Sequence, residues 1–243
     1  MANVNIIARR LHRWLAYLVF AQLAIWVVGG LTFAVIPFDS VIKGGDSVQA
    51  PLPPAIKPEQ LRVVADFLAE DTAMSWASHH QSSLGPVAKI TTKTGTQWLA
   101  LNTGRIAEPV SQDAITRFAQ SIYTGSGSHM TTRYLTAAES RFLGLVDELY
   151  GRTDVWQVAF DDAVGTRLYF DNITGVYLTV RNDFWVFYDA MWRLHIMDYS
   201  TGEDFNNPLL RIFTPLTFLF VVSGIILTWL SARRVLLRRR YTA

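Results

Sequence analysis

The chain has 243 residues, half of them apolar, with a mean hydropathy of +0.19 and a formal net charge of +2. It contains no cysteine, which excludes disulfides, thiolate metal sites and cofactors attached through cysteine. The basic excess lies near the two ends, because residues 37–207 hold 13 basic against 20 acidic residues, a formal charge of −7. We therefore expect no nucleic-acid partner.

Two uncharged apolar runs occupy residues 15–36 and 212–230. At about 1.5 Å per helical residue, each is long enough to cross the roughly 30 Å hydrocarbon core of a membrane. We predict a transmembrane helix over 15–36 after a basic arm, 1–14. A cleaved signal peptide is the alternative for this run, but the run is long for a signal and no A-x-A cleavage site follows it.

The second transmembrane helix is predicted over 208–231, with a basic tail at 232–243. Short arginine-rich flanks stay on the cytoplasmic side of a membrane. Both termini are therefore expected in the cytoplasm. The acidic middle of the chain is then expected on the far side, in contact with membrane lipid only near its ends.

The middle of the chain predicts helices followed by strands. Residues 37–57, which contain proline and glycine clusters, are expected to be a linker. Apolar positions at helical spacing predict a helix over 58–70, and β-forming runs predict strands over 87–92 and 96–101.

The same order recurs about 50 residues later. A helix is predicted over 112–123, with Ser111 as its N-cap. Strands follow at 155–160, 167–171 and 176–180.

The predicted fold class is a membrane α+β protein. Two transmembrane helices flank an exported domain, 58–181, of two weak repeats, 58–110 and 111–181. Each repeat is a helix followed by an antiparallel hairpin. The segment 182–207 is rich in aromatic residues, which favour the headgroup level of a bilayer. It is predicted to form a helix near the outer membrane surface that ends by Gly202.

Several blocks resemble a known family. The block from Val155 to Phe160, followed by Gly165-Thr166-Arg167-Leu168-Tyr169-Phe170-Asp171 and Thr174-Gly175, resembles the hairpin of a PepSY domain. The blocks Leu11-His12-Arg13-Trp14, Trp192-Arg193-Leu194-His195-Ile196-Met197-Asp198-Tyr199 and Ser223-Gly224 resemble signatures of PepSY-associated transmembrane proteins. Residues 37–110 match this family poorly.

The resemblance implies two kinds of function. Some of these membrane proteins, including small two-helix ones, are haem-containing ferric reductases of bacterial inner membranes. A b-type haem protein is thus expected, which passes electrons to ferric iron or a ferric chelate in the periplasm and supports ferrous iron uptake. The alternative is a non-enzymatic tethered PepSY module that binds a peptide or protein, and an accessory subunit of a transporter or respiratory complex is a third reading. No flavin or nicotinamide fingerprint is present, so a quinol or a cytoplasmic reductase would be the electron donor.

Histidine is the usual axial ligand of haem b, and His195 is the first candidate. Met191 and Trp192 precede it by about one helical turn, and Tyr188 and Asp198 are expected near the same face. The alternative is a histidine at the membrane interface whose ring packs on apolar side chains and whose outer nitrogen contacts water.

His12 is the second candidate ligand, with the alternative that it is a plain basic residue at the cytoplasmic mouth beside the arginines. His12 and His195 are expected about 30 Å apart, on opposite sides of the bilayer. They could not ligate one iron within one chain. We therefore expect a homodimer, in which a two-fold axis pairs His195 with its twin.

His79 and His80 are a further candidate metal site, expected in a loop with Glu70 and Asp71 nearby. An exposed loop pair is the alternative. Gln22 in the first span could contact haem or quinone, but an interhelical hydrogen bond is the preferred interpretation. No phosphate loop, H-E-x-x-H or G-x-S-x-G motif is present.

Overall fold

The computed structural model describes residues 2–39, 44–70, 74–92 and 95–241. The chain divides into two compact units. One, the helical unit, consists of Met1–Val35 and Tyr188–Ala243. The other, the sheet unit, consists of Ile36–Phe187.

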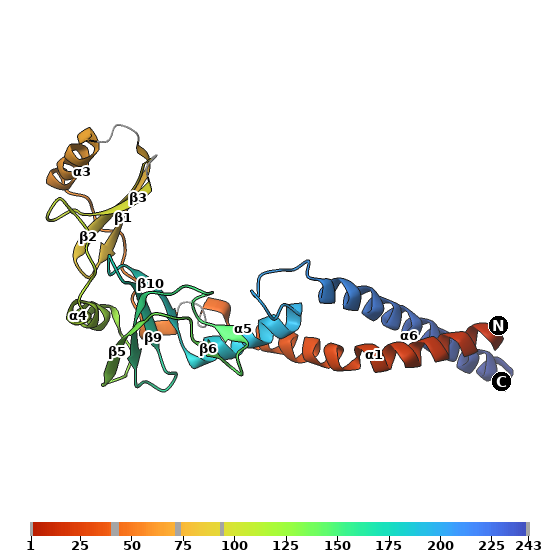
Figure 1. Ribbon diagram of the computed structural model, residues 1–243. Coiled ribbons are helices and arrows are strands. Elements are labelled where there is room, and N and C mark those ends of the chain that lie inside the picture. The colour runs from red at the N-terminus through yellow and green to blue at the C-terminus, as the bar shows by residue number, and fades with distance from the viewer. Residues whose placement is uncertain (1, 40–43, 71–73, 93–94, 242–243) are drawn as a thin grey trace. The chain divides into compact units, whose positions relative to one another are not determined.

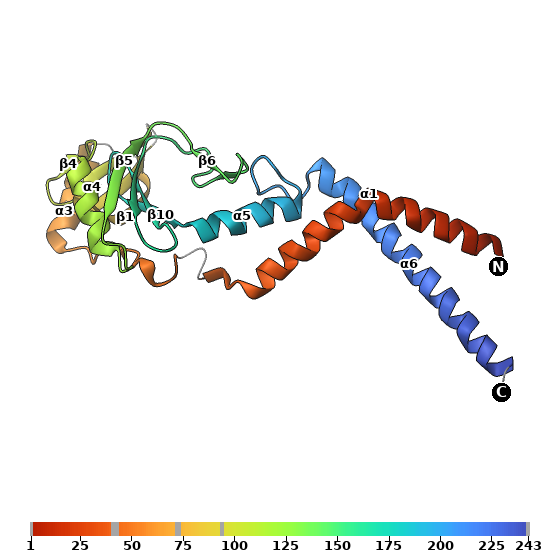
Figure 2. The ribbon, with the colours of Figure 1, turned by 90° about the horizontal axis from the view of Figure 1, so that it is seen from below.

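Two long helices dominate the helical unit. Helix α1 (Ala2–Val35) and helix α6 (Pro208–Tyr241) lie side by side in Figure 1 and cross in Figure 2. The segments Ile6–Val35 and Pro208–Val235 are long and apolar enough to cross a membrane, and only 17% and 6% of their apolar windows are buried. A core helix of a soluble protein would be mostly buried. The two helices therefore fit a two-span membrane protein.

The helices differ from the predicted ones at their ends. The segment 1–14, predicted as an arm, is already helical from Ala2, and α6 continues through the predicted tail to Tyr241. The aromatic segment forms helix α5 (Asp183–Ile196), which ends before Gly202 as predicted. Met197 has a φ of 57°, which is incompatible with a continuing right-handed helix.

Helix α3 (Pro58–Glu70), as predicted, precedes the first sheet of the sheet unit. Its apolar face, which includes Val63 and Phe67, packs on Ile90 and Leu99. The antiparallel sheet has four strands in chain order: β1 (Met74–Ser82), β2 (Gly85–Thr92), β3 (Gly95–Ala100) and β4 (Arg105–Ile106).

Helix α4 (Gln112–Ile122) precedes the second sheet, and the predicted cap is confirmed because the Ser111 hydroxyl accepts from the Ala114 amide. Its buried face packs on Val158, Leu168 and Phe170. This sheet has the order β10-β9-β8-β5, formed by β5 (Met130–Leu135), β8 (Val155–Phe160), β9 (Arg167–Asp171) and β10 (Tyr177–Arg181).

The two sheets share one topology. Each is a four-stranded antiparallel meander that follows a helix, and the second copy has the short hairpin of β6 (Ser140–Arg141) and β7 (Val146–Asp147) inserted after its first strand. The predicted recurrence of helix and antiparallel strands is therefore present, with more strands than the sequence indicated.

The predicted linker takes part in the sheet unit. After the short 3-10 helix η1 (Gly45–Ser47), Val48 bridges Tyr123 and packs against the core under α4. The Gln49 amide donates to the Ile122 carbonyl at 2.8 Å. This segment is therefore anchored on the second repeat.

Candidate functional site

The imidazole of His195, near the end of α5, packs on Gly29 of α1. A Cβ at position 29 would lie 3.2 Å from Nδ1 of His195, so any larger side chain would displace the ring. Phe33 meets the ring edge-to-face at 5.4 Å, and Trp26 lies 6.3 Å away between ring centroids. The imidazole is therefore packed against aromatic side chains of α1.

Three side chains hold the end of α5 in place. The last carbonyls of a helix have no partner within the helix. Here Gln22 donates to the Leu194 carbonyl at 3.1 Å, and Trp26 donates to that of His195 at 2.6 Å. Asn207 donates to the carbonyl of Ile196 at 2.9 Å. The interhelical hydrogen bond preferred for Gln22 is therefore confirmed, and these bonds fix the position of the imidazole.

The ring of His195 is electrostatically suited to ligation. Nδ1 is buried without a hydrogen-bond partner in the part of the chain that the structure describes. Burial lowers the pKa of His195 below its usual value. The ring is therefore neutral near pH 7, which is the form that binds metal ions.

Helix α5 presents an aromatic face to α1. Phe33 contacts Tyr188 at 4.9 Å and Trp192 at 5.7 Å as well as His195, so the predicted proximity of Trp192 and Tyr188 to the histidine is confirmed. Met191 is half-buried one turn before His195. These side chains supply the apolar surroundings that a porphyrin needs.

Asp198 lies just after the end of α5. Its carboxylate accepts hydrogen bonds from Ser200, Thr201 and the amides of Glu203 and Asp204. It therefore organises the loop between α5 and α6.

His12, on α1, faces α6. Its ring stacks on Phe220 with centroids 4.4 Å apart, and Nδ1 lies 2.9 Å from Oγ of Ser223. A Cβ at Gly224 would lie 3.2 Å from Cε1 of His12. The Ser223-Gly224 pair thus provides the hydrogen-bond partner and the space for this ring.

The hydrogen bonds around His12 favour one tautomer. The Ser223 hydroxyl donates to the Phe220 carbonyl at 2.7 Å, so its only proton is used. Nδ1 of His12 is then the donor to Ser223, which leaves the lone pair on Nε2. Metal-ligating histidines are commonly oriented in this way, by a hydrogen bond from the other ring nitrogen.

The two imidazoles lie at different levels of the helical unit. His12 and Gly29, against which His195 packs, are 17 positions apart on α1, or about 25 Å at the helical rise. They therefore cannot ligate the same iron within one chain, as the sequence predicted.

His79 and His80 do not form the predicted loop site. Both belong to strand β1, where adjacent side chains point to opposite faces of the sheet. Asp71 and the side chain of Glu70 lie outside the described residues. Within the described ranges, no group of three or more His, Cys, Asp or Glu residues could hold a metal ion.

Sequence reasoning missed Gly29, Phe33 and Phe220 as partners of the two histidines. Gly29-Gly30 in the first span and Ser223-Gly224 in the second were the available signal, but small residues in spans also serve general helix packing. Comparisons with protein families, curated proteins and solved structures yield no match. The class is therefore defined by the fold alone, as a two-span α+β protein compatible with a membrane location.

Proposed function

We propose that this chain is a b-type haem protein of a bacterial inner membrane that passes electrons to ferric iron or a ferric chelate in the periplasm, in support of ferrous iron uptake. One observation carries the proposal. Two imidazoles, His12 and His195, each pack on a glycine of a neighbouring helix. Nδ1 of His12 bonds Ser223, and Nδ1 of His195 is buried with no hydrogen-bond partner among the described residues.

The proposal requires that the first helix is retained and is not removed as a signal peptide, and three contacts of α1 support this. Removing α1 would take Gln22 and Trp26 away from the carbonyls at the end of α5. It would also remove His12 from Ser223. Unpaired backbone groups in an apolar setting are costly, so these contacts indicate that α1 belongs to the mature protein.

The proposed orientation rests on charge. Arg9, Arg10 and Arg13 begin α1, and Arg233 and Arg234 lie near the end of α6. Basic flanks stay in the cytoplasm. His195 would then lie toward the periplasmic side and His12 toward the cytoplasmic side.

His195 and His12 could hold haem b, and the aromatic side chains around His195 would suit its apolar ring. A haem with two histidine ligands needs two imidazoles at one level, whereas one chain supplies one per level. We propose a homodimer in which the His195 side chains of two copies hold haem near the periplasmic side. Four helices would then surround the cofactor. The His12 pair is a second, cytoplasmic candidate.

Bound haem would supply one-electron chemistry between ferric and ferrous iron. The chain itself would orient His12 through Ser223 and fix His195 through Gln22, Trp26 and Asn207. The negative charge of residues 37–207 would raise the local concentration of cations. A quinol or a cytoplasmic reductase remains the proposed electron donor.

The decisive experiment is an absorption spectrum of the full chain, purified in detergent from haem-sufficient cells. We expect a Soret band that shifts on dithionite and returns when ferric citrate is added. His195→Ala should remove most of the low-spin spectrum, whereas His129→Ala, in an exposed loop, should not. Colourless wild-type protein would contradict the haem proposal, and an unchanged spectrum in His195→Ala would eliminate this ligand.

A tethered binding module is the second candidate. Strand β5 is an edge strand, paired only with β8 among the described strands. An exposed edge can accept an added strand from a peptide. This function would be favoured if the purified protein is colourless and if an added peptide partner protects the β5 amides from hydrogen exchange.

A further inference from the structure

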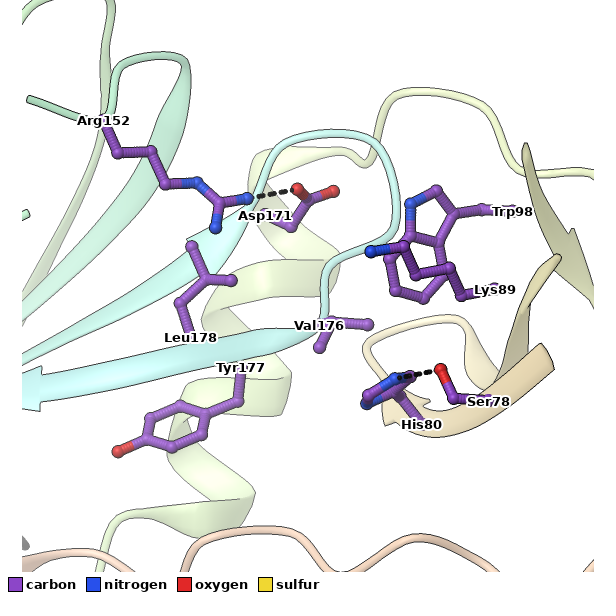
Figure 3. A pocket seen from close by; sticks show the side chains of 9 residues that line it. All are labelled: Ser78, His80, Lys89, Trp98, Arg152, Asp171, Val176, Tyr177 and Leu178. Atoms are coloured by element: carbon purple, nitrogen blue, oxygen red, sulfur yellow. Dashed lines mark hydrogen bonds and ion pairs between the residues drawn. The ribbon is translucent and has the colours of Figure 1, made fainter. Parts of the chain in front are cut away.

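The sheet unit contains a pocket that neither histidine site explains. It has a volume of about 430 Å³ and lies where the two sheets meet, within the size range of small-molecule sites. Figure 3 shows side chains approaching it from both sheets. Its lining comprises Ser78, His80, Lys89 and Trp98 from the first sheet, and Arg152, Asp171, Val176, Tyr177 and Leu178 from the second repeat.

The wall from the first sheet is set by strand register. Ser78 pairs with Lys89, and Lys89 pairs with Trp98, so the three side chains form a row across β1, β2 and β3. Ala88 and Ile90 alternate with Lys89 and pack toward α3. The row therefore lies on the face of the sheet opposite α3. His80, two positions after Ser78, shares that face.

Backbone contacts fix the two sheets against each other. Ser82 of β1 bridges Val176, and the Ser83 amide donates to the Gly175 carbonyl at 3.1 Å. A Cβ at Gly175 would lie 1.9 Å from the Ser83 hydroxyl oxygen, so the close approach requires glycine. The pocket is therefore formed without any ligand.

The charge of the pocket is positive. The Asp171 carboxylate forms an ion pair with Arg152 at 2.8 Å. It also accepts hydrogen bonds from Ile173 and Thr174. Its charge is thus compensated, whereas Lys89 has no ion-pair partner among the described residues and lies 5.7 Å from the Trp98 ring. Such a site is unusual in a segment with a formal charge of −7.

His80 lies beside Lys89 in the same positively charged pocket. Burial, followed by the charges of His79 and Lys89, lowers the pKa of His80 below its usual value. Its Nε2 lies 3.0 Å from the Ser78 hydroxyl, and its ring meets Trp98 edge-to-face at 5.5 Å. Because Nε2 and the hydroxyl bond each other, one of these two groups keeps a proton that it can donate to a ligand beside Lys89.

We propose that this pocket binds a small anion with carboxylate groups at both ends, such as a di- or tricarboxylate. Lys89 and Arg152 approach from opposite walls in Figure 3, so a ligand must carry negative charge at two ends to reach both. Arg152 uses one nitrogen for Asp171 and keeps further N–H donors for a carboxylate. Val176 and Leu178 supply an apolar wall for the carbon chain.

Isothermal titration calorimetry on the full chain in lipid nanodiscs tests this site, with citrate, succinate, acetate and inorganic phosphate as probes. We expect citrate or succinate to bind at least tenfold more tightly than acetate or phosphate, because only the former can reach both cations. Lys89→Gln and Arg152→Gln should each weaken binding about tenfold, since each removes a charge-assisted hydrogen bond. The heat of binding does not depend on haem, so this result is separate from the proposed redox function.

Two controls make the result specific. Arg117→Gln removes a cation from the exposed face of α4 and should leave citrate affinity unchanged. Lys89→Arg keeps the charge and should retain most of the binding. The proposal is overturned if citrate gives no heat at millimolar concentration. It is also overturned if acetate binds as tightly as citrate, or if Lys89→Gln and Arg117→Gln behave alike.

Discussion

Gly29 of α1 and His195 of α5 are in direct contact, with Nδ1 of the imidazole only 3.2 Å from where a Cβ at position 29 would stand. The adjacent Gly30 has nothing within 4 Å of the same position. Two neighbouring glycines in one helix therefore differ completely in what they permit, and only the first gives space to a candidate haem ligand.

Gly29→Ala should destabilise the helical unit by about 1–3 kcal/mol, because the added methyl overpacks a filled contact. Gly30→Ala should cost nothing and can gain up to about 1 kcal/mol, because alanine favours helix. Thermal unfolding in detergent, followed by circular dichroism, measures both. If haem is bound, its Soret band should shift only in Gly29→Ala. Equal effects of the two variants would contradict the packing argument.

Ser223→Ala should weaken the association of α1 with α6. The change removes the Ser223 hydroxyl, the one side-chain partner of His12 Nδ1 among the described residues, and leaves the Phe220 carbonyl at 3.3 Å. We therefore expect a loss of about 0.6–1.7 kcal/mol. Thr228→Ala is the matched control, because the Thr228 hydroxyl donates to the Gly224 carbonyl of its own helix. Thermal unfolding in detergent measures the stability of both variants and should show the larger loss in Ser223→Ala. A reduction potential that shifts in Ser223→Ala alone would tie His12 to a redox site.

Local patterns predicted much of the fold. Helix α3 and strands β8 and β9 have the predicted bounds, because apolar periodicity and turn residues agree there. Strand β1 was missed, because the polar run around Ser78 and His80 lacks an apolar alternation. Without β1, the pocket against Arg152 could not be predicted.

The candidate histidine sites could be predicted only in part. His12 and His195 stand out as ionisable residues near apolar spans. Their partners are far away in the sequence: Ser223 is 211 positions from His12, and Trp26 is 169 positions from His195. No single-sequence pattern encodes such pairs. The irregular segment near Leu143, where several non-glycine residues have positive φ, was equally inaccessible.

Glu148 forms a buried charge cluster in the sheet unit. Its carboxylate bonds Arg167 at 2.6 Å and accepts from the hydroxyl of Tyr169. Glu148→Gln should destabilise the unit by about 3 kcal/mol, because it leaves the buried Arg167 guanidinium with the exposed Asp183 as its remaining ion-pair partner among the described residues. Glu139→Gln removes the partner of Arg133 in an exposed pair and should cost about 0–1 kcal/mol. Protection of β8 and β9 amides against hydrogen exchange reports the loss, and equal costs would contradict the burial argument.

The loop between α5 and α6 depends on one ionised carboxylate. Burial alone would raise the pKa of Asp198, but hydrogen bonds from Ser200, Asp204 and Thr201 outweigh it and lower that pKa well below its usual value. Because the pKa is lowered in the folded protein, the stabilisation is complete at neutral pH. It declines only as the pH falls below about 4, the ordinary pKa of aspartate.

Asp198→Asn should therefore loosen this loop at neutral pH, where the wild-type loop is intact. Loss of the charge weakens the bonds to the amides of Glu203 and Asp204, and their hydrogen exchange should accelerate about tenfold. Asp113→Asn, at the exposed start of α4, is the control and should leave those amides unchanged. Lowering the pH of the wild-type protein should reproduce the variant only in the acid range. A loss of protection already near pH 6 would mean that another group holds the loop.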